Sequence, residues 1–72
     1  MGTEGARFAG SCLIAEGQYE PESRAMVLTF RDGTRRGYYG VPVAVWRGLT
    51  ATSSVGGFFN RHIKDIYRSE PL

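Results

Sequence analysis

The sequence predicts an α+β domain in which a three-stranded antiparallel β-meander is followed by two short α-helices packed on one face. Three observations predict this order. Apolar and polar residues alternate through much of residues 11–41, as in strands with one buried face. Asp32-Gly33, a strong hairpin signal, divides this region. After Pro42, apolar residues recur three to four positions apart, which is typical of helices that bury one side.

Length and composition describe one small domain. The chain has 72 residues, of which 42% are hydrophobic and 12% aromatic, a composition typical of a globular core and not of a disordered chain. Cys12 is the one cysteine, so no internal disulfide forms, and the core must supply the stability alone or together with a partner. No apolar run approaches the roughly 20 residues of a membrane span. Because residues 1–10 also lack the apolar stretch of a signal peptide, we expect a cytoplasmic protein.

The first predicted strand covers residues 11–19. Residues 1–10 before it are small and polar, and we expect them to form a flexible N-terminus. Gly17 inside the strand predicts a bulge or a close approach of another part of the chain. One face of this strand carries Leu13, Ala15 and Tyr19.

The second strand, residues 25–31, leads into the hairpin turn at Asp32-Gly33, for which two registers are open. A two-residue turn pairs Arg31 with Thr34. A three-residue turn, in which the glycine is left-handed and forms a bulge, pairs Phe30 with Thr34.

The two registers place different residues on the face of Phe30, because a slip of one residue moves every side chain across the sheet. The bulged turn places Arg36 and Tyr38 on that face, whereas the two-residue turn places Tyr39 there. We favour the bulged turn.

The first helix is predicted to begin at Pro42. The dihedral angle of this proline suits the first turn of a helix, and Val41 before it ends the third strand. Val45 and Leu49 recur at i and i+4, with Trp46 beside them. An internal Gly48, a weak helix former, predicts a short helix held by packing.

A linker over residues 50–57 and a second helix over residues 58–68 follow, so we expect the domain to span residues 11–68, with residues 69–72 as a tail. The apolar stripe of the second helix is formed by Phe59, Ile63, Ile66 and Tyr67. The predicted core comprises Leu13, Met26, Leu28, Phe30, Val41, Val45, Leu49, Phe59, Ile63 and Ile66, with Tyr67 as a further member.

One series of residues has an order and spacing specific enough to suggest a family: Phe30, Gly33, Tyr38, Val41-Pro42, Val45-Trp46, Leu49, Ser54, Gly56, Phe58-Phe59-Asn60, Ile63 and Tyr67. This series resembles the KTSC domain, a family named for its occurrence at the C-terminus of some lysyl-tRNA synthetases and also found as small stand-alone proteins of bacteria and phages. The resemblance covers about residues 11–67, and its most specific part runs from Gly56 to Tyr67. We assign structural roles within this set to Gly33, Pro42, Gly56, Phe59, Asn60, Ile63 and Tyr67.

The chain departs from the family pattern in two places. Arg36-Gly37-Tyr38 stands where the family carries Tyr-x-Tyr, so the first tyrosine is replaced by arginine. The first strand reads Glu16-Gly17-Gln18-Tyr19-Glu20 instead of an Ile-Gly-Tyr-Asp pattern. The association of the family with a synthetase implies RNA as the ligand to test first.

No catalytic or metal-binding constellation stands out in the sequence. His62, the one histidine, precedes Asp65 by three positions, and we expect it on the surface, whereas we expect Cys12 to be a small buried residue. Ser53-Ser54 is typical of a helix cap. One histidine and one cysteine do not form a zinc site, and no phosphate-binding glycine motif is present. We therefore expect no enzyme, no metal and no cofactor.

Asparagine is a mediocre helix former, so Asn60 early in the second helix calls for a local reason. We expect its side chain to bond backbone groups of the linker over residues 50–57. That bond would hold the two helices together.

Basic residues are the best binding feature. The net charge is +2, residues 31–72 carry seven basic and three acidic residues, and eight of the nine basic residues are arginine. Arginine together with aromatic side chains is a common way of holding single-stranded RNA. On the predicted second helix, one stripe is basic. The predicted nucleic-acid-binding set consists of that stripe, Arg61, Lys64 and Arg68, with Arg35, Arg36 and Tyr38 of the hairpin.

A protein-interaction module is the alternative hypothesis, either as a phage- or plasmid-type factor acting on a host protein complex or as a homodimer. A domain this small gains most from completing its core through a partner. The interface candidates are Tyr39, Trp46, Arg47 and Phe58, because aromatic and arginine side chains anchor interfaces. A continuous basic face would favour RNA, and an exposed apolar patch would favour protein. We expect neither a membrane nor a small-molecule cofactor as partner.

Overall fold

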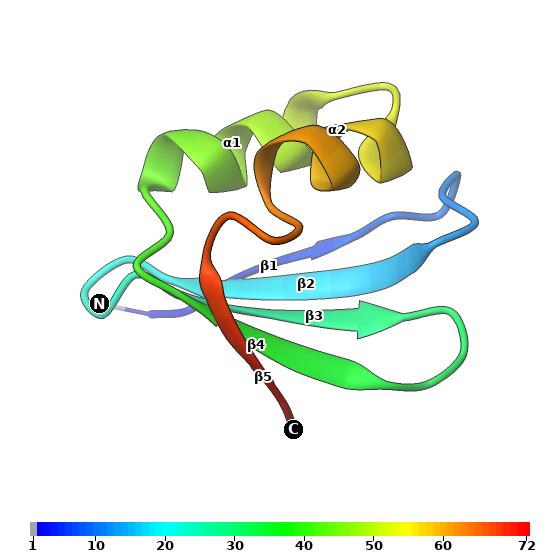
Figure 1. The fold of residues 1–72 in the computed structure, drawn as a ribbon. Coiled ribbons are helices and arrows are strands. Elements are labelled where there is room, and N and C mark those ends of the chain that lie inside the picture. The colour runs from blue at the N-terminus through cyan, green and yellow to red at the C-terminus, as the bar shows by residue number, and fades with distance from the viewer. Residues whose placement is uncertain (1) are drawn as a thin grey trace.

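The computed structural model describes residues 2–72 and shows one antiparallel sheet with both helices on the same face (Figure 1). Met1 lies outside the described residues. The elements are β1 (Glu4–Arg7), β2 (Ile14–Glu20), β3 (Ala25–Phe30), β4 (Arg35–Tyr39), α1 (Val43–Ala51), α2 (Val55–His62) and β5 (Arg68–Pro71). The strands lie in chain order, and each pairs antiparallel with the next. The predicted α+β class is confirmed, but residues 2–72 form five strands where three were predicted.

The two additional strands come from segments that we placed outside the domain. β1 lies within residues 1–10, predicted to be flexible, and pairs with β2. β5 replaces the end of the predicted second helix and most of the predicted tail, and pairs with β4. Both are four-residue strands at the sheet edges with mostly exposed side chains. Each pairs through backbone hydrogen bonds with a neighbouring strand, β2 or β4, whose edge would otherwise be unpaired. The side chains of β1 and β5 show no alternation of apolar and polar residues from which a strand could be predicted.

The hairpin between β3 and β4 adopts the favoured bulged turn. The backbone N–H of Phe30 donates to the carbonyl of Thr34 at 2.8 Å, and that of Gly33 donates to Phe30 at 3.0 Å. Gly33 is left-handed, with φ at +92°. The register therefore points Arg36 and Tyr38 to the face of Phe30, which is the face covered by the helices.

β2 presents different residues to the core from those predicted. Ile14 is fully buried, whereas Leu13, predicted to be in the core, is 38% exposed. A register shift between Ile14 and Glu16 explains the difference, because the extra residue reverses the alternation on one side of it. Beyond the shift, Tyr19 faces inward as predicted.

Trp46 occupies the centre of the core between helices and sheet. Its indole stacks on Tyr19 with ring centroids 5.7 Å apart, and its Nε1 donates to the carboxylate of Glu4 at 3.1 Å. A Cβ on Gly17 would lie 2.9 Å from Leu28 and 3.1 Å from the indole, so the predicted close approach is confirmed. The buried side chains are Phe8, Ile14, Tyr19, Met26, Leu28, Tyr38, Val41, Trp46, Leu49, Phe59 and Ile63.

The helices are joined more tightly than predicted. Pro42 caps α1 with φ at −65°, and only residues 52–54 separate α1 from α2, where residues 50–57 were predicted as linker. Gly48 allows this pairing, because a Cβ there would lie 2.5 Å from the ring of Phe58. Neither helix in the described chain is long and apolar enough to cross a membrane.

α2 ends at residue 62 and not at residue 68. The backbone N–H of Ile63 donates to the carbonyl of Phe59 at 3.0 Å, and the chain then reverses through Asp65, which has φ at +60°. Ile63 is fully buried, but Ile66 is 57% exposed and not in the core as predicted. Tyr67 is half-buried against the core. The reversal is favoured because it delivers the following residues to the free edge of β4.

Candidate functional site

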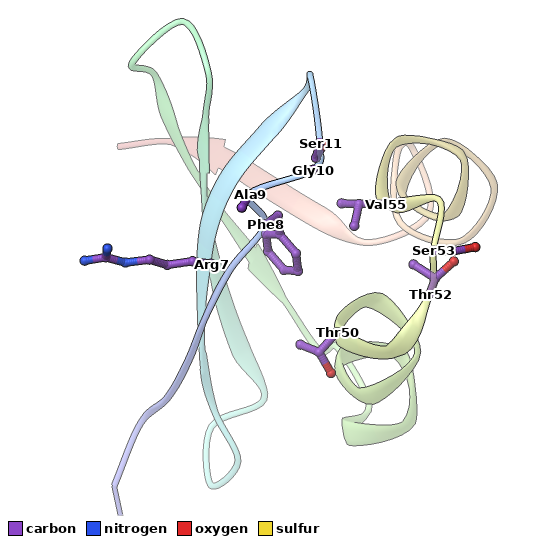
Figure 2. Close-up of a pocket in the computed structure, with 9 residues that line it drawn as sticks. All are labelled: Arg7, Phe8, Ala9, Gly10, Ser11, Thr50, Thr52, Ser53 and Val55. Carbon is purple, nitrogen blue, oxygen red and sulfur yellow. The ribbon is translucent and has the colours of Figure 1, made fainter.

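The sheet has one face covered by α1 and α2 and one face that no described element covers (Figure 1). We call the second the open face. Because side chains alternate along a strand, the strand registers assign residues to each face. Figure 2 shows Arg7 projecting from the sheet on the side away from the helices. The open face carries Arg7, Glu16, Gln18, Val27, Thr29, Arg35, Tyr39, Arg68 and Glu70.

Tyr39 is the aromatic residue of this face and is 36% exposed. Its hydroxyl donates to the Oε2 atom of Glu70 at 2.7 Å, and this hydrogen bond raises the pKa of Tyr39. A Cβ on Gly37 would lie 2.8 Å from the same hydroxyl oxygen. The side chain of Tyr39 therefore lies along the sheet over Gly37 and remains partly exposed.

Two arginines flank this ring. Arg68 is the cross-strand partner of Tyr39 on β5, and Arg35 lies four positions before Tyr39 on β4. Both are exposed, and neither makes a side-chain hydrogen bond or an ion pair within residues 2–72. The β4–β5 half of the open face thus presents two free guanidinium groups beside an aromatic ring.

The predicted nucleic-acid-binding residues do not form one surface. The prediction that Arg61, Lys64 and Arg68 form one basic stripe on a helix is wrong, because α2 ends before Lys64 and Arg68 belongs to β5. Arg61 is exposed on α2, on the helical side of the molecule. Arg36 points to the covered face, so the structure provides no continuous basic face joining it to Arg35.

Tyr38 is not available for stacking on a base, because it is only 4% exposed. Its ring packs edge-on against Phe59, with centroids 5.9 Å apart. Arg36, which replaces the first tyrosine of the family pattern, lies on the same face, and its Nε donates to the hydroxyl of Ser69 at 3.2 Å. A cavity of about 280 Å³ adjoins these residues and is lined by Phe30, Arg36, Tyr38, Phe59, Lys64, Asp65 and Ser69.

A second cavity, of about 250 Å³, lies between the β1–β2 loop and the α1–α2 linker (Figure 2). Phe8 and Val55 face its interior, and serine and threonine residues supply its polar groups. Among its lining residues only Arg7 is charged, and this side chain points away. The cavity therefore lacks a charged group for chemistry or for ligand recognition.

The four residues predicted as interface anchors do not lie on one surface. Trp46 is only 2% exposed and belongs to the core, so it is not an interface anchor. Arg47 is exposed on α1, and Phe58 is half-buried, with its ring centroid 4.5 Å from that of His62. Tyr39 alone among the four lies on the open face.

The remaining candidates for chemistry form no site among the described residues. Cys12 is exposed in a loop and not buried in a strand. His62 is exposed, as predicted, and residues 2–72 contain no cluster of three His, Cys, Asp or Glu side chains able to hold a metal ion. Ser54 is the residue that caps α2, but its side chain makes no capping bond.

Asn60 is exposed, and within the described residues its side chain forms no hydrogen bond to the linker, so the predicted clamp is absent. Gly56 lies in the first turn of α2, and no atom beyond its chain neighbours and its own helix backbone lies within 4 Å of the place that a Cβ would occupy there. The helix pair is held by packing at Gly48 and Phe58 instead.

Five antiparallel strands under two helices define a small α+β domain, and comparison with known proteins identifies its family. The model of the KTSC domain matches residues 10–67. The chain therefore belongs to the KTSC domain family, as its motifs predicted.

Two similar proteins illustrate this membership. The chain is 34% identical over 62 residues to a protein of Tsukamurella paurometabola, with 86% of this chain and 92% of that protein covered. The crystal structure of a KTSC domain protein from Yersinia pestis matches with a TM-score of 0.90 over 99% of both chains, at 24% sequence identity. The second likeness shows that the fold is shared.

Proposed function

We propose that this protein is a small, non-enzymatic module that binds single-stranded RNA through the β4–β5 half of its open face. The observation that carries the proposal is the placement of Tyr39 on the sheet, uncovered and flanked by the free guanidinium groups of Arg35 and Arg68. Bases stack on aromatic rings and phosphates bind arginines, and together these contacts hold single strands without requiring a deep pocket.

The dimensions of the face suit a few nucleotides. Strand residues advance by about 3.3 Å each, so Arg35 lies roughly 13 Å along β4 from Tyr39. A short single strand that stacks one base on Tyr39 reaches both arginines with its neighbouring phosphates. The same face carries two carboxylates, Glu16 on β2 and Glu70 on β5, so the phosphates of the strand should lie beside Arg35 and Arg68 and away from these two side chains.

The charge present supports weak, salt-sensitive binding. We expect dissociation constants on the order of micromolar at low salt, within the range of non-specific nucleic-acid binding. With about two or three phosphate contacts at about −0.7 each, the slope of log K against log salt should be roughly −1.4 to −2.1. Selectivity for RNA over DNA would come from contacts to the 2′-hydroxyl, for which Thr29 on β3, the cross-strand partner of Arg35, is an uncharged polar side chain of the open face.

A titration of labelled single-stranded RNA by fluorescence anisotropy tests the proposal, with single-stranded DNA of the same sequence as comparison. Tyr39→Ala should weaken binding by about 1–3 kcal/mol, the worth of one stacked base. Val43→Ala is the matched control, because Val43 is 38% exposed on α1, about as much as Tyr39, but lies on the helical layer. Equal affinity of Tyr39→Ala and wild type would contradict the proposal.

A protein partner on the same face is the alternative, and one observation favours it. The Cδ1 atom of Leu72 would lie 3.7 Å from a Cβ on Gly37, so an exposed apolar side chain adjoins Tyr39. β5 is also an edge strand, whose free backbone groups suit the addition of a strand from a partner. Absence of RNA binding together with a concentration-dependent dimer in sedimentation would favour this alternative.

A further inference from the structure

We propose that the cavity between β4 and the α2–β5 turn binds a small organic carboxylate, held by Arg36, Lys64 and Tyr38 against an aromatic wall. The site lies on the covered side of the sheet, whereas the RNA proposal concerns the open face. The two proposals are therefore tested independently. The ligand class follows from the unpaired donors, the net charge and the shape of the cavity.

Three segments build the cavity. β4 points Arg36 and Tyr38 inward from alternate positions, and β5 places Ser69 directly opposite Tyr38. Lys64 and Asp65 come from the turn that ends α2. Phe30 and Phe59, whose rings meet edge-on with centroids 5.7 Å apart, form the apolar wall of this space of about 280 Å³.

The hydroxyl of Tyr38 is a donor without a partner. Tyr38 is almost entirely buried, since its exposed fraction is 4%, and its hydroxyl forms no hydrogen bond within residues 2–72. No described side-chain nitrogen or oxygen is both fully enclosed and unpaired, so this hydroxyl keeps some contact with solvent, and Tyr38 is one of the residues that line the cavity. With no partner among the described residues, the hydroxyl is available to donate to an acceptor that enters the cavity.

The cations of the cavity are also unpaired. The Nε of Arg36 donates a hydrogen bond to the hydroxyl of Ser69, and the terminal nitrogens of Arg36 have no partner in the described chain. Lys64 likewise forms no ion pair there. Burial raises the pKa of Tyr38 while the charge of Arg36 opposes this, so the phenol stays protonated at neutral pH and donates. An anion therefore meets three donors and no competing internal acceptor except Asp65.

Charge selects a carboxylate over a phosphate. Arg36 and Lys64 with Asp65 give the cavity a net charge of +1, which a monoanion neutralises. A phosphate dianion would leave an excess negative charge close to Asp65, at a cost in free energy. The planar fork of a guanidinium also matches the two oxygens of a carboxylate.

The walls and the volume set the remaining features of the ligand. Phe30 and Phe59 favour an apolar, preferably flat, body. The cavity is slightly smaller than the roughly 300 Å³ at which typical ligand pockets begin, so the ligand is a small one. Such a carboxylate is either a free small acid or the C-terminus of a peptide with an aromatic last residue.

Phenylacetate is the probe, titrated into the isotope-labelled protein and followed by the NMR shifts of residues that line the cavity. We expect saturable shifts with a dissociation constant on the order of millimolar, because so small a ligand makes few contacts to offset the free-energy cost of association. Benzyl alcohol, which lacks the carboxylate, should bind at least about tenfold more weakly if charge-assisted bonds hold the ligand. A hexapeptide ending in phenylalanine, with a free or an amidated C-terminus, distinguishes the peptide source from the free acid.

Arg36→Gln and Arg35→Gln form a matched pair, because neighbouring arginines on β4 point to opposite faces. Arg36→Gln should weaken phenylacetate binding about tenfold or more and Arg35→Gln should leave it unchanged. Tyr38→Phe keeps the ring against Phe59 and removes only the hydroxyl, so its affinity should fall severalfold in a folded protein. Absence of saturable binding by the folded wild type, or equal binding by Arg36→Gln and Arg35→Gln, would overturn the proposal.

Discussion

The ring of Phe58 lies against the backbone of Gly48, so closely that a Cβ at Gly48 would stand 2.5 Å from the Cζ atom of Phe58. This contact joins α2 to α1. A glycine that weakens α1 by its low helix propensity is also the residue that allows α2 to pack. Replacing a glycine inside a helix by alanine usually stabilises the helix, but at Gly48 we expect the opposite.

Gly48→Ala should therefore destabilise the domain, by about 1–3 kcal/mol of overpacking set against the gain of roughly 1 kcal/mol in helix propensity. Gly56→Ala is the control, because Gly56 lies in α2 with no atom beyond its chain neighbours and its own helix backbone within 4 Å of a Cβ, and it should be neutral or stabilising. Urea denaturation followed by circular dichroism measures both. A Gly48→Ala variant more stable than wild type would show that the helices are not packed at this point.

Phe59→Ala should cost about 3–5 kcal/mol, as expected for a buried phenylalanine. The ring is 5% exposed and meets both Phe30 and Tyr38 edge-on. Ile66→Ala should cost less than about 0.5 kcal/mol, because Ile66 is 57% exposed beyond the end of α2. Thermal unfolding compares the two. Equal losses would indicate that the helix continues to residue 68 and buries Ile66.

Asp32 should show a lowered pKa that depends on Thr34. The hydroxyl of Thr34 donates to Asp32 at 2.6 Å and its backbone N–H at 2.9 Å, and these bonds hold the pKa of Asp32 below its ordinary value of 3.8. Because the folded pKa is the lower one, the stability that Asp32 contributes is complete above pH 3.8 and is lost as the pH falls through the lowered pKa.

NMR titration of the Asp32 carboxyl group in wild type, Thr34→Val and Thr34→Ser checks this account. Thr34→Val should raise the pKa of Asp32 toward its ordinary value, whereas Thr34→Ser, which keeps the hydroxyl, should not. A pKa that is the same in all three proteins would mean that the turn does not hold the carboxylate.

Local signals in the sequence located the central hairpin and favoured its bulged turn over a two-residue turn. The structure has this turn, with a left-handed Gly33, and the resulting register points Arg36 and Tyr38 inward. The same register implied that Tyr38 would be covered by the helices, so its place among the stacking candidates conflicted with the favoured hairpin.

The edges of the sheet could not be predicted, because edge strands form through backbone hydrogen bonds and not through a side-chain pattern. β1 and β5 contain few apolar residues, and nothing in them alternates. Phe59, Ile63 and Tyr67 are spaced as on a long helix, yet the same residues also fit a helix that ends before a turn. The left-handed conformation of Asp65 shows that the helix ends before a turn. A glycine at this position would have indicated a left-handed residue, whereas an aspartate gives no such clear signal in the sequence.

The candidate sites depended on these same features. The basic stripe disappeared when α2 ended early, while β5 carried Arg68 to Tyr39 on the open face. A pairing between the last residues of the chain and the hairpin involves contacts distant in sequence, which periodicity does not reveal.

The salt dependence of RNA binding by two matched double variants tests the central claim most directly. Arg35→Gln/Arg68→Gln removes two arginines from the open face, and Arg47→Gln/Arg61→Gln removes two exposed arginines from the helices, with the same loss of net charge. We expect the first variant to bind more weakly and to lose about 1.4 from its slope of log K against log salt, at about 0.7 per phosphate contact, while the second retains the wild-type slope. Equal slopes for the two variants, or a larger loss in the helical one, would contradict an RNA site on the open face.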